Sequence, residues 1–254
     1  MDALFLLAQH PEGLPLGEIA RELHVKPPTA HNLLRTLASR GFVERLRDPV
    51  RYRLGGGLLD LAATHWRALL PYRGQEAVTR LARRFPSAVM TLAQFVGREV
   101  VAMLRASPER PEWAERGAYQ TMHPYGTASA LVFQAFWTEE QRAAYRQWHP
   151  FWEHGAHLWR DIEAVDEFLE QVRQRGHAVP DQLNKPVWPA AVPVFSPGGG
   201  PAAALGIAIP LDEADRATRR EVLETLKEAA GELTHAGPGR PLQEEPEHVD
   251  SRTG

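Results

Sequence analysis

The sequence lacks cysteine altogether, although it runs to 254 residues. This absence excludes disulfide bonds, thiolate metal ligands and cysteine nucleophiles. The sequence also lacks any apolar run close to the roughly 20 residues that a helix needs to cross a bilayer. The first residues, Met-Asp-Ala-Leu-Phe, lack the basic segment that begins a secretory signal peptide. We therefore expect a cytoplasmic protein that has no membrane partner.

Motifs of catalysis and of cofactor binding are missing as well. The chain contains neither a P-loop nor a nucleophile elbow. The glycines at 198–200 lie between two predicted strands rather than before a helix, so they do not form a phosphate-binding loop. We predict no catalytic residue, no cofactor and no enzymatic activity.

Charge is unevenly distributed along the chain, whose formal net charge is −3. Residues 21–53 contain eight basic and three acidic side chains, so the remainder of the chain is acidic. A basic segment attached to an acidic remainder is typical of a nucleic-acid-binding module joined to a second domain. The length of the chain allows two domains of ordinary size.

The basic segment contains a pattern that predicts an amphipathic recognition helix. Pro27 suits its first position, and Gly41 suits the position just after its last turn. Apolar side chains recur at the i, i+3, i+4 and i+7 spacing, which predicts one buried face made of Ala30, Leu33, Leu34 and Leu37. The opposite face is short, polar and basic, which suits a helix in the DNA major groove.

The flanking segments complete a winged helix-turn-helix. Short helices are predicted over residues 2–9 and 17–23, and a tight turn at 24–26 leads into the recognition helix. Alternation over 42–46 and 51–54 predicts a hairpin, the wing, that turns at Asp48-Pro49. Its arginines either contact phosphates or form a solvated charged surface. We predict that DNA is contacted by Lys26, Thr29, His31, Asn32, Arg35, Arg51 and Arg53.

The rest of the chain predicts a connector and an α+β domain. Residues 55–57, three glycines, are expected to be a flexible joint, and the following helix over 58–70 is expected to end at Pro71. Strands are predicted over 89–95, 99–104, 190–195 and 202–209, and helices over 127–137, 161–175, 215–234 and from Thr138 onward. The expected division is 1–55 for the winged helix-turn-helix, 56–71 for the linker helix, 72–236 for the second domain and 237–254 for a disordered tail.

Several segments resemble the IclR family of transcriptional regulators. Residues 16–23, 29–37 and 51–55 are similar to the N-terminal domain of that family. The segment Met-His-Pro-Tyr-Gly-Thr-Ala-Ser-Ala-Leu at 122–131 resembles the family's LHATALGKAL segment. Gly-His-Ala-Val at 176–179, followed by 191–195, resembles its GYAVD…AAPVF segment, so the likeness covers about residues 1–235 in order. His24 stands where the family usually has a turn glycine, so a positive φ there would be strained.

The resemblance implies a C-terminal GAF-like domain that binds a small-molecule effector and modulates operator affinity. It also implies homodimers or homotetramers on palindromic double-stranded DNA. The effector pocket is expected near 123–129 and 180–188, with the candidates His123, Tyr125, Gly126, Thr127, Ser129, Asp181, Gln182 and Trp188. Backbone N–H groups at a helix start near Thr127 independently favour an anion. The resemblance implies that the anion is an organic acid, and Trp188 favours an aromatic one. In the alternative interpretation, His123 and Tyr125 only pack or cap.

Residues 148–159 have the side-chain types of a zinc or nickel site. Three imidazoles and one carboxylate lie within nine residues: His149, Glu153, His154 and His157. Pro150 and Gly155 predict a loop, in which the spacing of ligands on a helix does not apply. We therefore expect packing and hydrogen-bonding groups and no metal, with metal binding as the alternative.

A ligand-responsive transcriptional regulator is the predicted function, and two alternatives stay open. One is an enzyme that acts on a small molecule and uses its N-terminal module only for protein contacts. The other is a DNA-binding protein that answers to no ligand. The lack of a base–nucleophile pair disfavours the first. The aromatic character of the expected pocket, with Trp188, disfavours the second.

Overall fold

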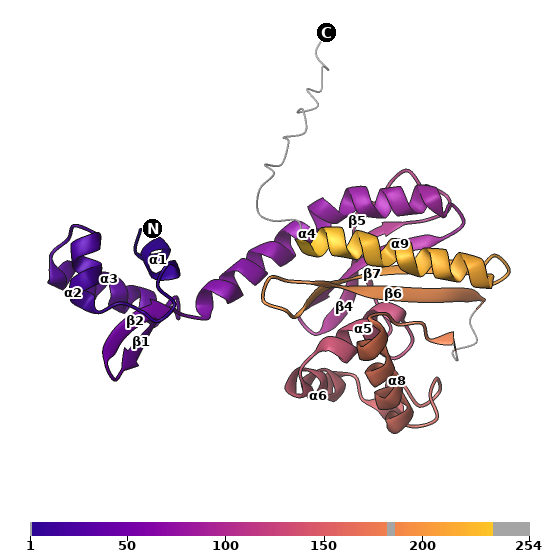
Figure 1. Cartoon of the computed structure of the whole chain (residues 1–254). Helices are drawn as coiled ribbons and strands as arrows, with labels where there is room; N and C mark the ends of the chain where they lie inside the picture. The colour runs from indigo at the N-terminus through magenta and orange to yellow at the C-terminus, as the bar shows by residue number, and fades with distance from the viewer. Residues whose placement is uncertain (1, 182–185, 236–254) are drawn as a thin grey trace, which may run out of the picture.

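The computed structural model describes residues 2–181 and 186–235, and its N-terminal part is a small domain of three helices and a hairpin (Figure 1). These elements are α1 (Asp2–Ala8), α2 (Leu16–Glu22), α3 (Pro27–Ser39), β1 (Val43–Arg47) and β2 (Val50–Leu54). The two strands pair antiparallel. The core of this domain gathers Leu7, Ile19, Leu34, Val43 and Tyr52. The predicted winged helix-turn-helix is confirmed.

The backbone around α3 follows most of the sequence pattern. Pro27 occupies its first turn, and Gly41 has a φ of +70° just beyond its end. His24 has a φ of +54°, so the strain expected for a residue other than glycine at this turn is present. The prediction that Leu33 is buried is wrong. It is 41% exposed, because α3 packs along a narrower line centred on Ala30 and Leu34.

The glycines that follow the wing are held by close backbone contacts. The N–H of Gly55 donates to the carbonyl oxygen of Phe42 at 2.9 Å, and the N–H of Gly57 donates to that of Gly41 at 3.0 Å. A Cβ on Gly55 would overlap the carbonyl oxygen of Gly41, so only glycine permits this approach. The structure has a packed connection at Gly55 and Gly57 where the sequence predicts a flexible joint.

The next helix, α4 (Gly57–Arg84), runs through Pro71 for 28 residues, so the prediction that it ends at Pro71 is wrong. Pro71 has no N–H and leaves the carbonyl of Arg67, four residues earlier, without its helical donor. The side-chain amide of Gln94 supplies a donor to that carbonyl at 2.8 Å. Because the carbonyl is satisfied in this way, the helix continues and joins the two parts of the molecule (Figure 1).

The C-terminal domain contains a five-stranded antiparallel sheet with the order β5-β4-β3-β7-β6. Its strands are β3 (Val89–Val96), β4 (Glu99–Ala106), β5 (Glu115–Thr121), β6 (Val187–Phe195) and β7 (Pro201–Pro210). Four of them match the predicted strands. The sequence pattern missed β5, because it is an edge strand whose residues, Glu-Arg-Gly-Ala-Tyr-Gln-Thr, lack an alternation of apolar and polar side chains.

Helices cover both faces of this sheet (Figure 1). One face packs against α4 and α9 (Arg216–His235), and the other packs against α5 (Ala128–Phe136) and α8 (Ile162–Arg175). The helix α6 (Glu139–Trp148) and the one-turn α7 (Phe151–His154) contribute to the same core as α5. The α+β fold class with a winged helix-turn-helix, a linker helix and a GAF-like domain is confirmed.

For three sequence predictions, the outcome depends on which residues the structure describes. Within residues 2–181 and 186–235, no helix is both long and apolar enough to cross a bilayer. The tail at 237–254 and the effector candidate Gln182 lie outside these ranges. The predictions for the tail and for Gln182 therefore stay predictions.

Candidate functional site

The exposed face of α3 carries the polar side chains that the sequence predicts to contact DNA. Thr29, His31, Asn32 and Arg35 are all exposed, and the exposed Lys26 directly precedes the helix. In the described part of the chain, neither Lys26 nor Arg35 forms an ion pair with a carboxylate. The helix thus presents two cations and several short hydrogen-bonding groups, which can contact phosphates and base edges.

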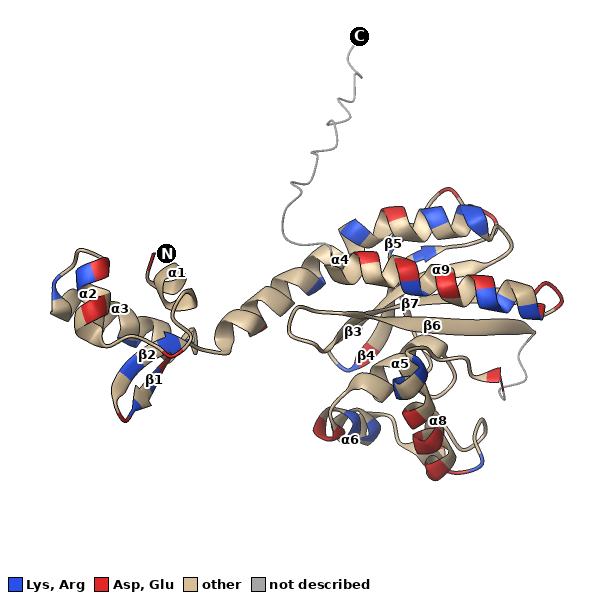
Figure 2. Cartoon of the chain, viewed as in Figure 1, with Lys and Arg blue, Asp and Glu red and all other residues tan. Residues whose placement is uncertain are grey.

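The register of the wing separates its arginines onto two faces. Arg45 lies opposite Tyr52, and Arg47 lies opposite Val50. Cross-strand partners share a face, and Tyr52 packs in the core with Leu34 of α3. Arg45 and Arg47 therefore lie on the face of the hairpin that is turned toward α3, and both are exposed. Figure 2 shows basic residues along both strands of the wing.

Arg51 and Arg53 lie on the other face and have partners within the protein. Nη1 of Arg51 donates to the carbonyl oxygen of Gly13 at 3.0 Å. Nε and Nη2 of Arg53 donate to Oε2 of Glu44 at 3.0 and 2.9 Å. The sequence prediction named Arg51 and Arg53 as the DNA contacts of the wing and left out Arg45 and Arg47. The two-residue period of a strand is the signal that separates the pairs.

Five of the predicted effector residues gather at the start of α5. Thr127 caps this helix, since its Oγ1 accepts the N–H of Ala130 at 3.4 Å and donates to the carbonyl oxygen of His123 at 2.9 Å. A Cβ on Gly126 would lie 2.8 Å from Nδ1 of His123. Gly126 thus allows the His123 ring, which is partly exposed, to pack against the turn that leads into α5.

Tyr125, in the middle of this turn, is fully buried and anchors a neighbouring segment. Its hydroxyl donates to the carbonyl oxygen of His149 at 2.9 Å, and its own carbonyl accepts the indole N–H of Trp159 at 2.8 Å. Burial raises the pKa of Tyr125, so the phenol stays a neutral donor. Tyr125 fixes the start of α5 to the chain between α6 and α8.

Two hydroxyl groups lie beside Gly206 where α5 packs on the sheet. A Cβ on Gly206 of β7 would lie 2.8 Å from Oγ of Ser129 and 2.9 Å from Oγ1 of Thr91. Gly206 therefore leaves room for both hydroxyls beside the strand. Thr91 and Gly206 belong to this polar spot but were not among the sequence candidates. No local pattern marks them, because β3 and β7 are far apart in the chain and are brought together by pairing.

Asp181 and Trp188 lie elsewhere, so the expectation that they join the α5 residues in one pocket is wrong. Trp188 is 2% exposed and packs in the core between the sheet, α4 and α9. The guanidinium carbon of Arg219 lies 5.5 Å from the centre of a Trp188 ring, and Nη1 of Arg219 lies 3.9 Å from Oδ2 of Asp181. Side chains alternate between the two faces of the sheet along β6. Trp188 and Ala190 therefore point to the face covered by α9, whereas Ala191 points to the face covered by α5.

The histidines of 148–159 gather against the start of α5. The ring centre of His123 lies 6.4 Å from that of His154 and 5.7 Å from that of His157. Pro150 and Gly155 bound the short helix α7 rather than a plain loop, which corrects the sequence prediction. Among the described residues, no group of three or more histidine, aspartate or glutamate side chains has the arrangement of a metal site.

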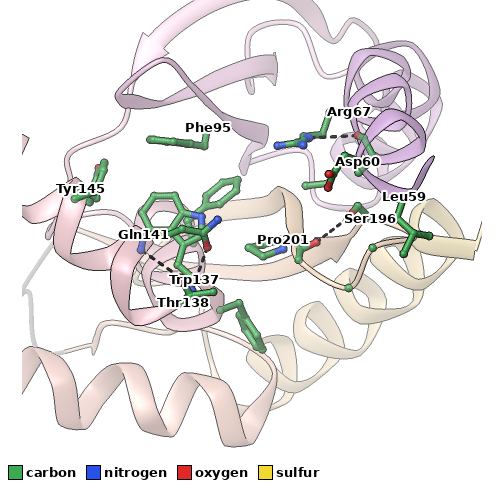
Figure 3. A pocket seen from close by; sticks show the side chains of 18 of the residues that line it. Leu59, Asp60, Arg67, Phe95, Trp137, Thr138, Gln141, Tyr145, Ser196 and Pro201 are labelled. Carbon is green, nitrogen blue, oxygen red and sulfur yellow. Dashed lines mark hydrogen bonds between the residues drawn. The ribbon is translucent and has the colours of Figure 1, made fainter. Parts of the chain in front are cut away.

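A cavity of about 900 Å³ lies where α4 approaches the C-terminal domain (Figure 3). Its walls come from the first turns of α4, the β3–β4 turn, the α5–α6 corner and the β6–β7 turn. None of the residues that the sequence predicts to bind DNA or effector lines it. Its walls come from four distant segments of the chain, so no single motif could have indicated it.

Family models match both parts of the chain. The IclR helix-turn-helix domain matches residues 1–47, and the C-terminal domain of the bacterial transcriptional regulator IclR matches residues 72–235. The HTH-type transcriptional regulator BhcR of Paracoccus denitrificans is 28% identical over 253 residues, which cover 92% of this chain and 84% of that protein. A glycerol operon regulatory protein of Streptomyces coelicolor is 45% identical over 62 residues, or 24% of each chain.

Solved structures share the fold across nearly the whole length. IclR of Thermotoga maritima has a TM-score of 0.57 at 22% identity, with 92% of this chain and 95% of that chain covered. An IclR homologue of Microbacterium hydrocarbonoxydans, complexed with 4-hydroxybenzoate, has a TM-score of 0.52 at 24% identity and covers 89% of this chain and 92% of its own. The arrangement of helices and sheet in Figure 1 is therefore that of these proteins.

Proposed function

Because the chain belongs to the IclR family of DNA-binding transcriptional regulators, we propose that it binds an operator through α3 and the wing and that a small-molecule effector modulates this binding. The observation that carries the proposal is the exposed face of α3, where Lys26 and Arg35 stand without carboxylate partners among the described residues. This face combines cations with hydrogen-bonding groups at the tip of a winged helix.

In the proposed DNA complex, Asn32 and Arg35 read base edges, and Lys26, Thr29 and His31 contact bases or phosphates beside them. On the wing, phosphate contact falls mainly to Arg45 and Arg47. They share the face of the hairpin that is turned toward α3, whereas Arg51 and Arg53 already bond within the protein. A homodimer or homotetramer would place two such heads about 34 Å apart, or a multiple of it, on a palindromic site.

For the effector we propose a site at the start of α5, formed by His123, Thr127 and Ser129 with Thr91 of β3. This segment carries hydroxyl groups, an imidazole and the N-terminal backbone of a helix, which favours an organic or aromatic acid. The similar structure complexed with 4-hydroxybenzoate, an aromatic acid, agrees with this ligand class.

We also propose the assignment of functions to domains that the sequence predicts. Residues 1–55 would bind DNA, 56–71 would connect and 72–236 would bind the effector. The helix α4 crosses the second of these boundaries. A change at the effector site can therefore reach the DNA-binding heads through a continuous helix.

A selection from sheared genomic DNA with the full chain tests the DNA half of the proposal. The selected fragment is then titrated at several salt concentrations. We expect a palindromic fragment and a linear fall of log K with log salt, as several phosphate contacts require. An Arg35→Ala variant should lose the preference for that fragment, while Arg220→Ala, an exposed change on α9, should keep it. Sequence-indifferent binding by the unchanged protein, with and without candidate acids, would refute the operator proposal.

The effector half is tested on the same fragment with a panel of aromatic and aliphatic acids. An acid that shifts operator affinity should stop doing so in Ser129→Val or Thr127→Val, while operator binding without the acid persists. If those variants respond to the acid as the unchanged protein does, the effector site is not at the start of α5.

A further inference from the structure

The cavity beneath α4 has a wall of aromatic rings that hold one another in place. Phe95 stands edge-to-face to Trp137, with ring centres 4.8 Å apart, and to Tyr145 at 6.0 Å. Trp137 and Tyr145 are themselves edge-to-face at 5.0 Å. Trp137 and Tyr145 are buried, whereas Phe95 is 38% exposed at the cavity. This wall is a rigid apolar surface that can take a flat ring.

Two guanidinium groups line the same cavity without carboxylate partners in the described part of the chain. Arg67 donates from Nε to the carbonyl oxygen of Ala63 in its own helix at 3.2 Å. The guanidinium carbon of Arg98 lies 3.1 Å from the centre of a Trp148 ring. Asp60 is the lone carboxylate among the described residues that line the cavity. The lining is therefore net cationic, which favours an anionic group in a ligand.

The place of these residues in the fold distinguishes the cavity from the proposed effector site. The cavity is bounded on one side by α4, and its lining includes none of the residues of the proposed effector site, Thr91, His123, Thr127 and Ser129. Figure 3 shows Arg67 and Asp60 extending from α4 on one side, with Phe95 and Trp137 across from them. A molecule in the cavity would therefore contact the linker helix and the C-terminal domain at once.

We propose that this cavity binds a planar aromatic carboxylate, with its rings against Phe95 and Trp137 and its carboxylate toward Arg67 and Arg98. The volume of about 900 Å³ is ample for a molecule of two fused rings. Such a ligand braces the first turns of α4 against the sheet. The consequence for operator affinity rests on the proposed function, whereas binding of the ligand does not.

The test is a calorimetric titration of the full chain with 2-naphthoate, with naphthalene-2-carboxamide as the uncharged isostere. Three variants address the cavity: Arg67→Gln and Arg98→Gln each remove one cation, and Ala144→Trp places an indole at its mouth. Arg142→Gln is the matched control, since it removes a charge from the same helix as Ala144 outside the cavity. Ser129→Ala lies in the proposed effector site and reports any binding of 2-naphthoate at the start of α5.

We expect 2-naphthoate to bind, the carboxamide to bind about tenfold more weakly, and each arginine variant to lose about tenfold in affinity. Ala144→Trp should abolish binding at the cavity, while Arg142→Gln should bind as the unchanged protein does. A loss of binding in Ser129→Ala with the cavity variants unchanged would place the acid at the start of α5 and overturn the proposal. Binding that the three cavity variants leave intact, or no binding at millimolar 2-naphthoate, would overturn the proposal. If sedimentation shows that Ala144→Trp separates associated chains, the cavity holds a second copy of this chain, and the small-molecule proposal is again overturned.

The regulatory consequence is measured separately on the selected operator fragment. Saturating 2-naphthoate should change operator affinity in the unchanged protein but not in Ala144→Trp. Because the calorimetric experiment contains no DNA, a failure of the operator proposal leaves the ligand result readable on its own.

Discussion

The side-chain amide of Gln94 donates a 2.8 Å hydrogen bond to the carbonyl oxygen of Arg67, the carbonyl that Pro71 leaves without a helical donor. Gln94 is 6% exposed and lies on β3, next to Phe95 of the cavity. This bond satisfies the carbonyl that Pro71 leaves open inside α4. It also ties the linker helix to the sheet at the proline.

Replacing Gln94 should therefore destabilise the protein in a way that depends on Pro71. Gln94→Ala leaves a carbonyl without its donor and should lower the free energy of unfolding by about 1–3 kcal/mol. In a Pro71→Ala background, the new backbone N–H can bond the same carbonyl, so Gln94→Ala should cost clearly less. Urea denaturation of the four proteins gives the coupling energy.

Gln134 offers a matched control for that cycle. It is fully buried and donates from Nε2 to the carbonyl oxygen of Pro124 at 2.8 Å, far from Pro71 in the chain. Gln134→Ala should cost the same in both backgrounds. Equal costs of Gln94→Ala with and without Pro71 would show that the bond does not compensate for the proline.

Arg35 is predicted to discriminate between bases. Arg35→Ala should weaken binding to the selected operator by about 1–3 kcal/mol and relax the preference at one position of each half-site. Binding is measured by fluorescence anisotropy on the operator and on fragments substituted at single positions. A uniform loss across all fragments would instead make Arg35 a phosphate contact.

The two faces of the wing predict different salt dependences. Arg45→Ala and Arg47→Ala should each reduce the slope of log K against log salt by about one. Arg53→Ala should change the slope less, since Arg53 is bonded to Glu44 in the free protein. The opposite ranking would mean that the Arg53–Glu44 pair opens on DNA and that this face of the hairpin meets the phosphates.

Much of the fold was accessible from the sequence, because local signals decide it. Pro27 and Gly41 set the ends of α3, Thr138 with Gln141 forms a capping box at the start of α6, and Gly97 turns β3 into β4. Each of these features depends on residues only a few positions apart. The family resemblance added the order of the domains.

The sequence alone could not predict the contacts between residues that lie far apart along the chain. Pro71 removes a donor from the helix, and Gln94 of β3 supplies a replacement from elsewhere in the chain. Trp188 could face either side of the sheet until the helices were placed on its two faces. At the candidate effector site, Thr127 was predicted from the family resemblance and from its position at the start of a helix. Thr91 and Gly206 were missed because only strand pairing brings them together.

His177, just after α8, predicts a pH dependence of stability. Burial lowers the pKa of His177 below its usual value, and the positive charges of Lys227 and Arg175 lower it further. The hydrogen bond to the carbonyl oxygen of Arg175 acts in the opposite direction but is outweighed. The folded state thus favours the neutral ring. As pH falls below about 6.5, the unfolded state takes up the proton first, so the free energy of unfolding declines until the folded pKa is passed.

The measurement compares urea midpoints at several pH values between 7.5 and 5 for the unchanged protein and for His177→Gln. The variant lacks this group, so its midpoint should fall less on acidification. His10→Gln, at an exposed position after α1, controls for the loss of one histidine. Parallel curves for the unchanged protein and His177→Gln would mean that the folded environment of His177 does not disfavour its charge.

The connection between the wing and α4 gives a last prediction, since its glycines differ in what surrounds them. A Cβ on Gly55 would overlap the carbonyl oxygen of Gly41, a backbone atom that cannot move alone. Gly55→Ala should therefore destabilise the N-terminal domain by about 1–3 kcal/mol or more.

A Cβ on Gly56 would meet nothing within 4 Å, and its φ of −63° suits alanine. Gly56→Ala should therefore be neutral or stabilise by up to about 1 kcal/mol. If Gly56→Ala keeps full stability but loses operator binding, the heads need freedom at this connection. If it keeps both, the packed contacts of Gly55 and Gly57 define how α4 holds the DNA-binding domain.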